Sequence, residues 1–532
     1  MNFDVIVIGS GFGGAITACR LAEAGYKVLI LERGRRWDKN TYPSVSKNPN
    51  DWLWKNEAPE KFNGWTDLRV FPNMSVIQGA GVGGGSLIYA NISTEARPDV
   101  FQSPWPSEIT YNELKPHYDA VAQFMNVQKV PENQWPERTR LMREGANAIN
   151  EGGRFKLLDL AVSFDPNISF APNDPPNDLQ SKTFTNAQGR EQGYCVHKGL
   201  CDAGCPVDAK NTLDLTYIAQ AENKGAEVRP LHIVKTIESM SGGYRVHFDR
   251  LQTGQRLAGN ETARIVIVAA GSLGSTELLF RCRDEHQTLP NISHFLGRNW
   301  SSNGDFLTPA LYPLRNVSPA KGPTITSTID FLDRSQAGQS FWIEDGGTPD
   351  LLGYYVESKF KRSWFGSLHA DVLVNFINQS LGRRNAFANI MPWFSQGIDA
   401  ADGQLSWKRY WWQFGLGAKR LQLHWDITNS RPVFDAIVSM HKKLTEKTGG
   451  VPLVSPSWTI FQDLVTPHPL GGCNMGTSTT NGVVNHKGEV FGYPNLYVAD
   501  AAIIPTALGV NPSRTIGALA ERIAAQIKME GR

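Results

Sequence analysis

The sequence predicts an α/β protein whose main domain is a parallel sheet flanked by helices and assembled from segments far apart in the chain. A β-branched run at 5–8 leads into a glycine turn, a helical pattern at 15–24 and a second apolar run at 27–31. Two later runs, 264–270 and 495–500, have the same strand character. Strand, turn, helix and strand in this order form the βαβ unit of a Rossmann-type domain.

The length of 532 residues exceeds what one compact core usually accommodates, so we expect two domains. The Rossmann-type domain would take the discontinuous segments 1–95, 190–300 and 461–532. The segments 96–189 and 301–460 would form an α+β substrate-binding domain with an antiparallel sheet.

The charge balance excludes some classes of partner. The formal net charge is only +2, which gives no broad field to attract nucleic acid, so we expect no nucleic-acid partner. The chain opens with Met1 and a strand, without a basic or cleavable leader, which favours a cytoplasmic location; export with a partner subunit that carries the signal is the alternative. The six cysteines form no disulfide framework, as expected for reduced thiols.

The first glycine turn predicts a phosphate-binding site. Gly9 would permit the tight turn, Gly11 would let the backbone approach a pyrophosphate, and Gly14 would let the helix pack closely on the strand. The N-terminus of the helix would then face the phosphates. Glu32 ends the second strand, where it would accept hydrogen bonds from an adenosine ribose. This motif alone does not separate FAD from NAD.

A second glycine-rich stretch occupies 79–91, after a segment at 40–75 that is expected to be loop-like. So many glycines cost backbone entropy and indicate backbone lying against a flat ligand. A flexible linker is the alternative, but the interleaved Val82, Leu87 and Ile88 are not typical of linkers.

Aromatic residues crowd the expected substrate-binding domain. They favour a pocket for a bulky apolar or ring-shaped substrate, with plain core packing as the alternative. Basic and aromatic residues alternate at 359–365, which suits peripheral contact with a membrane surface as well as a solvated face. The aromatic residues concerned are Phe341, Trp342, Phe360, Trp364, Phe365, Trp393, Phe394, Trp407, Trp411, Trp412 and Trp425.

Several motifs in a fixed order resemble those of one enzyme family. Besides the two glycine stretches they are His232-Ile233-Val234, Ala269-Ala270-Gly271-Ser272-Leu273-Gly274-Ser275, Asn303-Gly304-Asp305, His468-Pro469-Leu470-Gly471-Gly472-Cys473 and Gly509-Val510-Asn511-Pro512. The chain resembles the glucose–methanol–choline (GMC) oxidoreductases, within them the bacterial cholesterol oxidase branch. The region 305–460 matches poorly.

The resemblance implies FAD as the resident cofactor. In the same way it implies that His468 is the active-site histidine beside the flavin, Asn511 its polar partner, and Glu344 the carboxylate of the cholesterol oxidases. Val234 would contact the adenine through its backbone. The predicted cofactor-binding residues are Gly9, Gly11, Phe12, Gly13, Gly14, Glu32, Arg33, Gly79, Gly83, Gly84, Gly85, Ser86, Asn91, Val234, Ala270, Gly271, Asp500, Ala501, Asn511 and Pro512.

These residues predict oxidation of an alcohol by hydride transfer to flavin. His468 would take the hydroxyl proton, because imidazole titrates near neutrality. Asn511 would orient the oxygen, and Glu344, if buried, would take part in proton transfer. The electron acceptor would be O₂ or an acceptor protein or quinone. A flavin-binding protein without turnover is the alternative outside enzymes.

Three cysteines, Cys195, Cys201 and Cys205, form a C-x5-C-x3-C-P pattern. It is similar to that of the FAD-dependent sugar dehydrogenases, where such thiolates hold a 3Fe–4S cluster that passes electrons to a cytochrome. A sugar or polyol dehydrogenase is therefore the alternative enzyme. A loop of free thiols or one disulfide would explain the pattern without a cluster, and zinc would lack a clear fourth ligand.

Overall fold

The computed structural model describes residues 1–42, 51–168, 170–171, 177–347, 386–409, 417–454, 458 and 463–530. Within these residues the first sheet has seven strands in the order β10-β11-β12-β1-β2-β9, with β21 paired to β12. Its strands are β1 (Phe3–Ile8), β2 (Val28–Leu31), β9 (Glu227–Arg229), β10 (His232–Met240), β11 (Gly243–Gln252), β12 (Gln255–Val268) and β21 (Leu496–Val498).

The long strand β12 joins two kinds of pairing. Its second half runs parallel to β1, from Phe3 opposite Ala263 to Ile8 opposite Val268. Its first half pairs antiparallel with β11, and β11 pairs with β10, so these three strands form a meander. The sequence therefore identified only the parallel half of a longer strand. The predicted α/β fold with a Rossmann-type sheet is confirmed.

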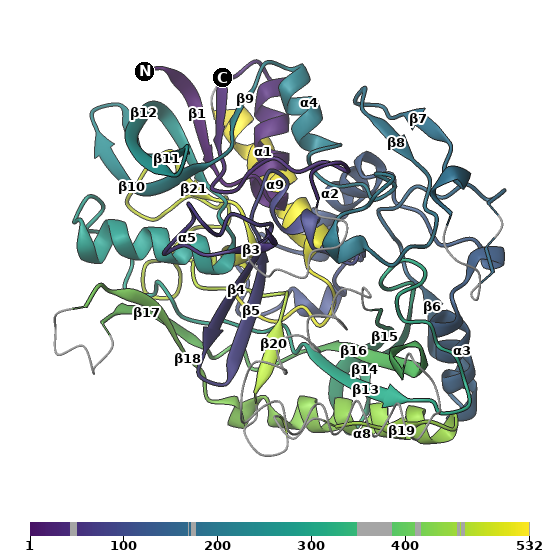
Figure 1. Cartoon of the computed structure of the whole chain (residues 1–532). Coiled ribbons are helices and arrows are strands. Elements are labelled where there is room, and N and C mark those ends of the chain that lie inside the picture. Colours follow the sequence, from purple (N-terminus) through teal and green to yellow (C-terminus); the bar gives the residue numbers. More distant parts are fainter. Residues whose placement is uncertain are drawn as a thin grey trace.

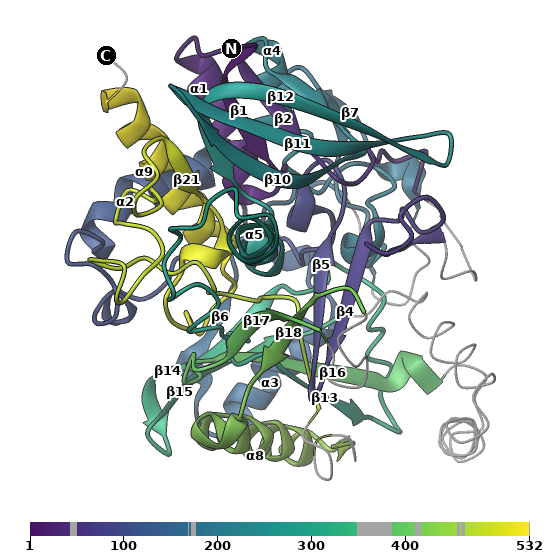
Figure 2. The same cartoon turned by 90° about the vertical axis from the view of Figure 1, so that its left-hand side faces the viewer.

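Helices cover one face of the parallel strands. Figure 1 shows α1, α4 and α9 on one side of β1, and Figure 2 shows the meander crossing the other side. Strand β2 and the part of β1 after the exposed Asp4 are apolar and buried, because both of their faces are covered. The helices of this part are α1 (Phe12–Glu23), α2 (Tyr111–Phe124), α4 (Tyr217–Asn223), α5 (Gly271–Phe280) and α9 (Ser513–Glu530).

A second sheet lies below the first in both views and is antiparallel, as predicted. Its order is β19-β13-β16-β15-β14-β6, and α8 packs on β13, β15 and β16. Its elements are α3 (Glu137–Ala148), β6 (Phe155–Leu157), β13 (Phe306–Leu311), β14 (Ser327–Gln336), β15 (Gln339–Asp345), β16 (Ile390–Gly397), α8 (Arg431–Lys447) and β19 (Val451–Pro452).

A third sheet corrects the expectation that 40–75 is loop-like. Strands β4 and β5 form a hairpin with Phe71 opposite Met74, and Asn73 turns the chain at φ 59°. Alternation of polar and apolar residues on both sides of Pro72 was the available signal, and the density of tryptophan, asparagine and proline obscured it. The strands are β3 (Leu53–Trp54), β4 (Thr66–Phe71), β5 (Met74–Gly79) and β20 (Leu464–Thr466).

Two short hairpins complete the strands of the described residues. They are β7 (Thr183–Thr185) with β8 (Glu191–Gly193), and β17 (Gln404–Lys408) with β18 (Arg420–His424). No helix in the described part of the chain is long and apolar enough to span a bilayer. The segment 359–365, with its predicted membrane contact, lies outside the described residues, and the exact domain bounds stay a prediction.

Candidate active site

The first glycine turn brings three backbone segments into close contact. Gly9 has φ 96°, which a side chain would strain. A Cβ on Gly13 would lie 1.4 Å from the carbonyl oxygen of Ala499, and one on Gly14 would lie 2.1 Å from that of Gly9. At Gly11 a Cβ would meet nothing nearer than 3.9 Å. At Gly13 and Gly14 the turn is therefore closely packed against other backbone segments. At Gly11 it is open, and a phosphate could approach there.

Glu32 lies at the end of β2 and is buried. Its carboxylate accepts hydrogen bonds from the Ser10 backbone N–H at 3.0 Å, the Ser10 hydroxyl at 2.7 Å and the Gly34 N–H at 2.9 Å. Burial raises the pKa of Glu32, and these hydrogen bonds oppose the rise. The Ser10 hydroxyl also accepts from the N–H of Gly83 at 3.1 Å, which joins the two glycine-rich stretches.

The stretch 79–91 forms a turn directly on the first one. Gly84 has φ 52°, and a Cβ there would lie 2.5 Å from the Cα of Gly11, whereas nothing lies within 4 Å of one on Gly85. Asn91 is fully buried, and neither amide atom has a hydrogen-bond partner among the described residues. A buried amide without partners is costly, so this cradle fits a polar ring system such as a flavin.

The remaining predicted cofactor positions lie at the ends of nearby elements. Asp500 accepts from the N–H of Gly271 at 2.8 Å and from Ala502 N at 2.8 Å, so its carboxylate holds the start of α5. Arg33 is ion-paired with Asp67 at 2.8 Å. The others are Phe12 at the start of α1, Gly79 at the end of β5, Ser86 in a 3-10 turn, Val234 in β10, Ala270 before α5, Ala501 after Asp500, and Pro512 before α9.

His468 follows β20 and is held by a carboxylate that the sequence did not single out. Its Nδ1 lies 2.9 Å and 3.1 Å from the two oxygens of Asp305, which is fully buried. The Thr466 hydroxyl donates to Asp305 at 2.5 Å and accepts from the His468 N–H at 2.9 Å. Burial raises the pKa of Asp305, while His468 and Thr466 lower it again.

Glu344 lies in β15 and is fully buried, which excludes a surface turn. The Gln396 amide donates to it at 3.1 Å, and Trp342 in turn donates to Gln396. Burial raises the pKa of Glu344 well above its ordinary value, Gln396 and Asn511 lower it, and Asp305 adds to the rise. The structure thus brings the predicted Glu344 and Asn511 together, beside the pair formed by Asp305 and His468.

Few of the described aromatic side chains reach this site. The Phe394 ring is 6.2 Å from the His468 ring, and Phe394 pairs with Glu344 across β15 and β16. Phe341 and Trp393 are fully buried in the core instead. Core packing therefore accounts for those two, whereas Phe394 places an apolar ring next to the histidine.

The cysteine loop contacts the second glycine stretch through a buried lysine. Lys210 donates to the carbonyl oxygen of Leu87 at 3.0 Å and to that of Cys201 at 2.5 Å, and burial lowers its pKa to about 8. Cys195, Cys201 and Cys205 are free thiols. Across the described parts of the chain, no group of three His, Cys, Asp or Glu side chains is arranged to hold a metal ion.

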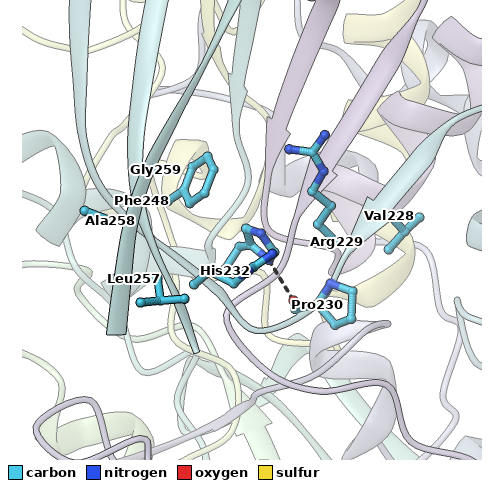
Figure 3. A pocket seen from close by; sticks show the side chains of 9 residues that line it. Val228, Arg229, Pro230, His232, Phe248, Leu257, Ala258 and Gly259 are labelled. Atoms are coloured by element: carbon cyan, nitrogen blue, oxygen red, sulfur yellow. Dashed lines mark hydrogen bonds between the residues drawn. The ribbon is translucent and has the colours of Figure 1, made fainter. Parts of the chain in front are cut away.

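A cavity of about 620 Å³ opens between β9 and the meander, away from this site. Figure 3 shows the His232 ring at its centre, with Phe248 and Arg229 on either side. Its lining contains none of the predicted active-site residues. It is therefore not the place where an alcohol would meet His468.

Three residues of the site were missed by sequence reasoning. Asp305 belongs to the motif Asn303-Gly304-Asp305, but nothing in the sequence assigned it a role in the site. Thr466 and Gln396 were not predicted. For Asp305 the local signal was the Asn-Gly pair before it, which is typical of a tight turn. In the structure both residues of this pair have positive φ, and Asp305 after them is buried. Gln396 reaches Glu344 only through strand pairing, which no local pattern specifies.

Comparison with known proteins identifies the family. Residues 426–520 match the GMC oxidoreductase model, and residues 7–37 match an NAD(P)-binding Rossmann-like domain. A cholesterol oxidase of Acinetobacter baumannii is 30% identical over 550 residues, with 99% of this chain and 94% of the relative covered. Another from Mycobacterium tuberculosis (strain ATCC 25618 / H37Rv) is 30% identical over 549 residues, covering 98% and 90%.

A solved structure agrees with the fold. The pyridoxine 4-oxidase from Mesorbium loti has a TM-score of 0.61 at 16% identity, with 99% of both chains covered. The cradle at Asn91 and the open glycines fit the FAD that this family carries, so the predicted cofactor, enzyme class and resemblance are confirmed. The chain belongs to the GMC oxidoreductase family and is an FAD-dependent enzyme that oxidises alcohols.

Proposed function

We propose that the enzyme oxidises a bulky apolar alcohol, with His468 as the base that takes the hydroxyl proton. The observation that carries this proposal is the contact of the His468 imidazole with the buried Asp305, next to Glu344 and Asn511. A base for an alcohol must carry a free lone pair that faces the substrate. Since Nδ1 of His468 faces a carboxylate, Nε2 is the nitrogen left for that task.

Bound FAD supplies the acceptor for the hydride that leaves the carbinol carbon. His468 accepts the O–H proton as that hydride departs. Asn511 can donate its amide N–H to the developing alkoxide, and its Oδ1 has no partner among the described residues. Burial raises the pKa of Glu344 well above its ordinary value, so its protonated carboxyl group can donate a hydrogen bond to the substrate oxygen without placing a second charge beside the base.

The apolar substrate class is supported by two observations. The relatives at 30% identity are named cholesterol oxidases. The Phe394 ring lies 6.2 Å from the His468 ring, and the Trp342 indole donates a hydrogen bond to Gln396. Two aromatic side chains therefore border the polar site. A sugar would need several polar partners at such a surface.

The proposal also covers the electron acceptor, whose identity depends on whether the cysteine loop holds a cluster. O₂ is the acceptor we favour, with an acceptor protein or quinone as the alternative, in a cytoplasmic enzyme. A 3Fe–4S cluster on Cys195, Cys201 and Cys205 would instead indicate a dehydrogenase that passes electrons onward. Iron and acid-labile sulfide analysis on anaerobically purified protein decides between them: a cluster would contain about three irons per chain.

The experiment that tests the proposal is anaerobic reduction of the FAD enzyme by sterols, terpenoid and long-chain alcohols, and sugars, followed by air. Bleaching by an apolar alcohol with rapid reoxidation supports it, and bleaching by sugars alone refutes the substrate class.

His468→Ala should keep its FAD and lose about 10²–10⁴-fold in the rate of flavin reduction. His294→Ala, which changes an exposed histidine, is the control. Full activity in His468→Ala would remove the histidine from the mechanism.

A further inference from the structure

We propose that Asp305 is a positioning residue that acts through His468, and that the loop at 301–305 sets the distance between the base and Asn511. The inference rests on the proposed function, because it takes His468 as the base. It goes beyond that function by assigning the tautomer and the orientation of the base to a residue that touches no substrate.

The contact between the two side chains specifies the tautomer. Both oxygens of Asp305 lie within 3.1 Å of Nδ1, so Nδ1 carries the proton and Nε2 keeps its lone pair. The Thr466 hydroxyl donates to one of these oxygens at 2.5 Å, which prevents the carboxylate from turning away. The His468 side chain is 16% exposed and that of Asp305 is 0% exposed, so only the imidazole can meet a substrate.

The same loop holds the segment that carries Asn511. The side chain of Asn303 accepts from the N–H groups of Leu508 at 2.8 Å and Gly509 at 3.0 Å, and donates to the carbonyl oxygen of Val510 at 2.8 Å. These are the three residues before Asn511. Asn303 and Asp305 therefore fix the amide and the imidazole from positions two residues apart.

The loop itself is anchored to the second sheet. Asp399 accepts from the N–H groups of Ser302 at 3.0 Å and Gly304 at 3.2 Å. Gly304 has φ 63°, and a Cβ there would lie 2.4 Å from the carbonyl oxygen of Gly397. Because the loop cannot shift without breaking these contacts, it can hold a catalytic geometry.

In the step that this arrangement serves, the alcohol O–H bond breaks and its proton goes to Nε2 of His468. The C–H bond breaks and its electron pair leaves with the hydrogen as hydride, for which FAD, when bound, would supply the acceptor. The C–O bond becomes a carbonyl. His468 is then a cation, and the carboxylate of Asp305 stabilises that charge without taking the proton.

The first test is Asp305→Asn in the FAD enzyme, followed by anaerobic stopped-flow reduction with a turned-over alcohol. The amide keeps the volume and a partner for Thr466 but loses the charge. The rate should fall on the order of 10²–10⁴-fold, with KM and FAD content nearly unchanged. Asp333→Asn, which changes an exposed carboxylate paired with Arg154, is the matched control.

The pH profile gives a readout that a purely structural role would not move. Without the carboxylate the imidazolium is less stable, so the acid limb of the reduction rate should shift to lower pH. Glu344 on β15 interacts electrostatically with Asp305, Asp345 next to it acts on Glu344, and Asp399 after β16 binds the loop at Ser302 and Gly304; all three remain in the variant. An unshifted limb would overturn the positioning role.

A double-mutant cycle separates the inference from the proposed function. In a His468→Ala background, Asp305→Asn should cost less than about threefold, because its effect passes through the absent imidazole. Equal losses in both backgrounds would overturn the inference. Wild-type turnover in His468→Ala would refute the proposed function, whereas an inactive His468→Ala with a fully active Asp305→Asn refutes only the role of Asp305.

If Asp305→Asn does not fold, Thr466→Val is the second variant, with Thr466→Ser as its control. Loss of the hydroxyl frees one carboxylate oxygen, and we expect a rate loss of roughly tenfold in valine that serine restores. An unchanged rate in Thr466→Val would count against the inference.

Discussion

Replacing Glu344 by Gln removes an ionisable group whose pKa the fold raises, and this changes how the stability of the fold depends on pH. The carboxyl group is fully buried, and burial with the nearby charges of Asp345 and Asp305 raises its pKa well above the ordinary value. In the unfolded chain the pKa returns to about 4.3. The unfolded state therefore ionises first as the pH rises, and this destabilises the fold.

Between the two pKa values, the contribution of Glu344 falls by about 1.4 kcal/mol per pH unit. It is intact below the unfolded pKa and is lost as pH rises toward the folded pKa. Gln has no such dependence. The Glu344→Gln variant should therefore gain stability relative to wild type by about this amount for each pH unit from about 4.3 up to the pKa of Glu344 in the folded state, and by no more above it.

Urea unfolding at several pH values from 4.5 to 8, in one cofactor state, measures this difference. Glu446→Gln on the exposed side of α8 is the control, which should show no comparable gain. Parallel stability curves for wild type and Glu344→Gln would refute the reasoning, because they would mean that Glu344 ionises in the fold as it does in the unfolded chain.

Two further predictions concern the cofactor site. Gly13→Ala should lose FAD, measured as the ratio of flavin to protein absorbance, because its Cβ would lie 1.4 Å from the carbonyl oxygen of Ala499. Gly25→Ala, where the space is open, should keep FAD and lose only about 1–2 kcal/mol from its positive φ; equal FAD content in both would contradict this. Lys210→Met leaves the buried carbonyl of Leu87 without its donor, which costs about 1–3 kcal/mol and should weaken FAD binding roughly 10- to 100-fold. An unchanged Kd in a fluorescence titration of apoprotein would rule that out.

The parts of the fold that the sequence predicted are those encoded by short-range patterns. The βαβ unit follows from glycine spacing, because close approaches such as that of Gly13 to Ala499 tolerate no side chain. The stretch 79–91 was assigned to ligand contact for the same reason. The hairpin at β4 and β5 was missed because its alternation is short and surrounded by residues typical of loops.

The site was only half predictable, because its supporting contacts join distant segments. His468 and Asp305 are 163 positions apart in the sequence, and Gln396 and Glu344 are 52 positions apart. Nothing local to Asp305 indicates that β20 will end beside it. The residues that would meet the substrate could be proposed from motifs, whereas those that hold them follow from strand register.

The two buried carboxyl groups of the site differ in the groups that face them. Burial raises the pKa of both, and the charge of Asp305 adds to the rise at Glu344, whereas the imidazole of His468 and the hydroxyl of Thr466 oppose the rise at Asp305. These neighbours favour ionisation of Asp305, beside the base, over ionisation of Glu344. Because the groups interact, a pH–rate profile reports the set and not any single residue. It follows that Asp305→Asn should lower the pKa of Glu344 and so bring the stability of Glu344→Gln closer to that of its parent at high pH. An undiminished difference would mean that burial and Asp345 raise the pKa of Glu344 without a contribution from Asp305.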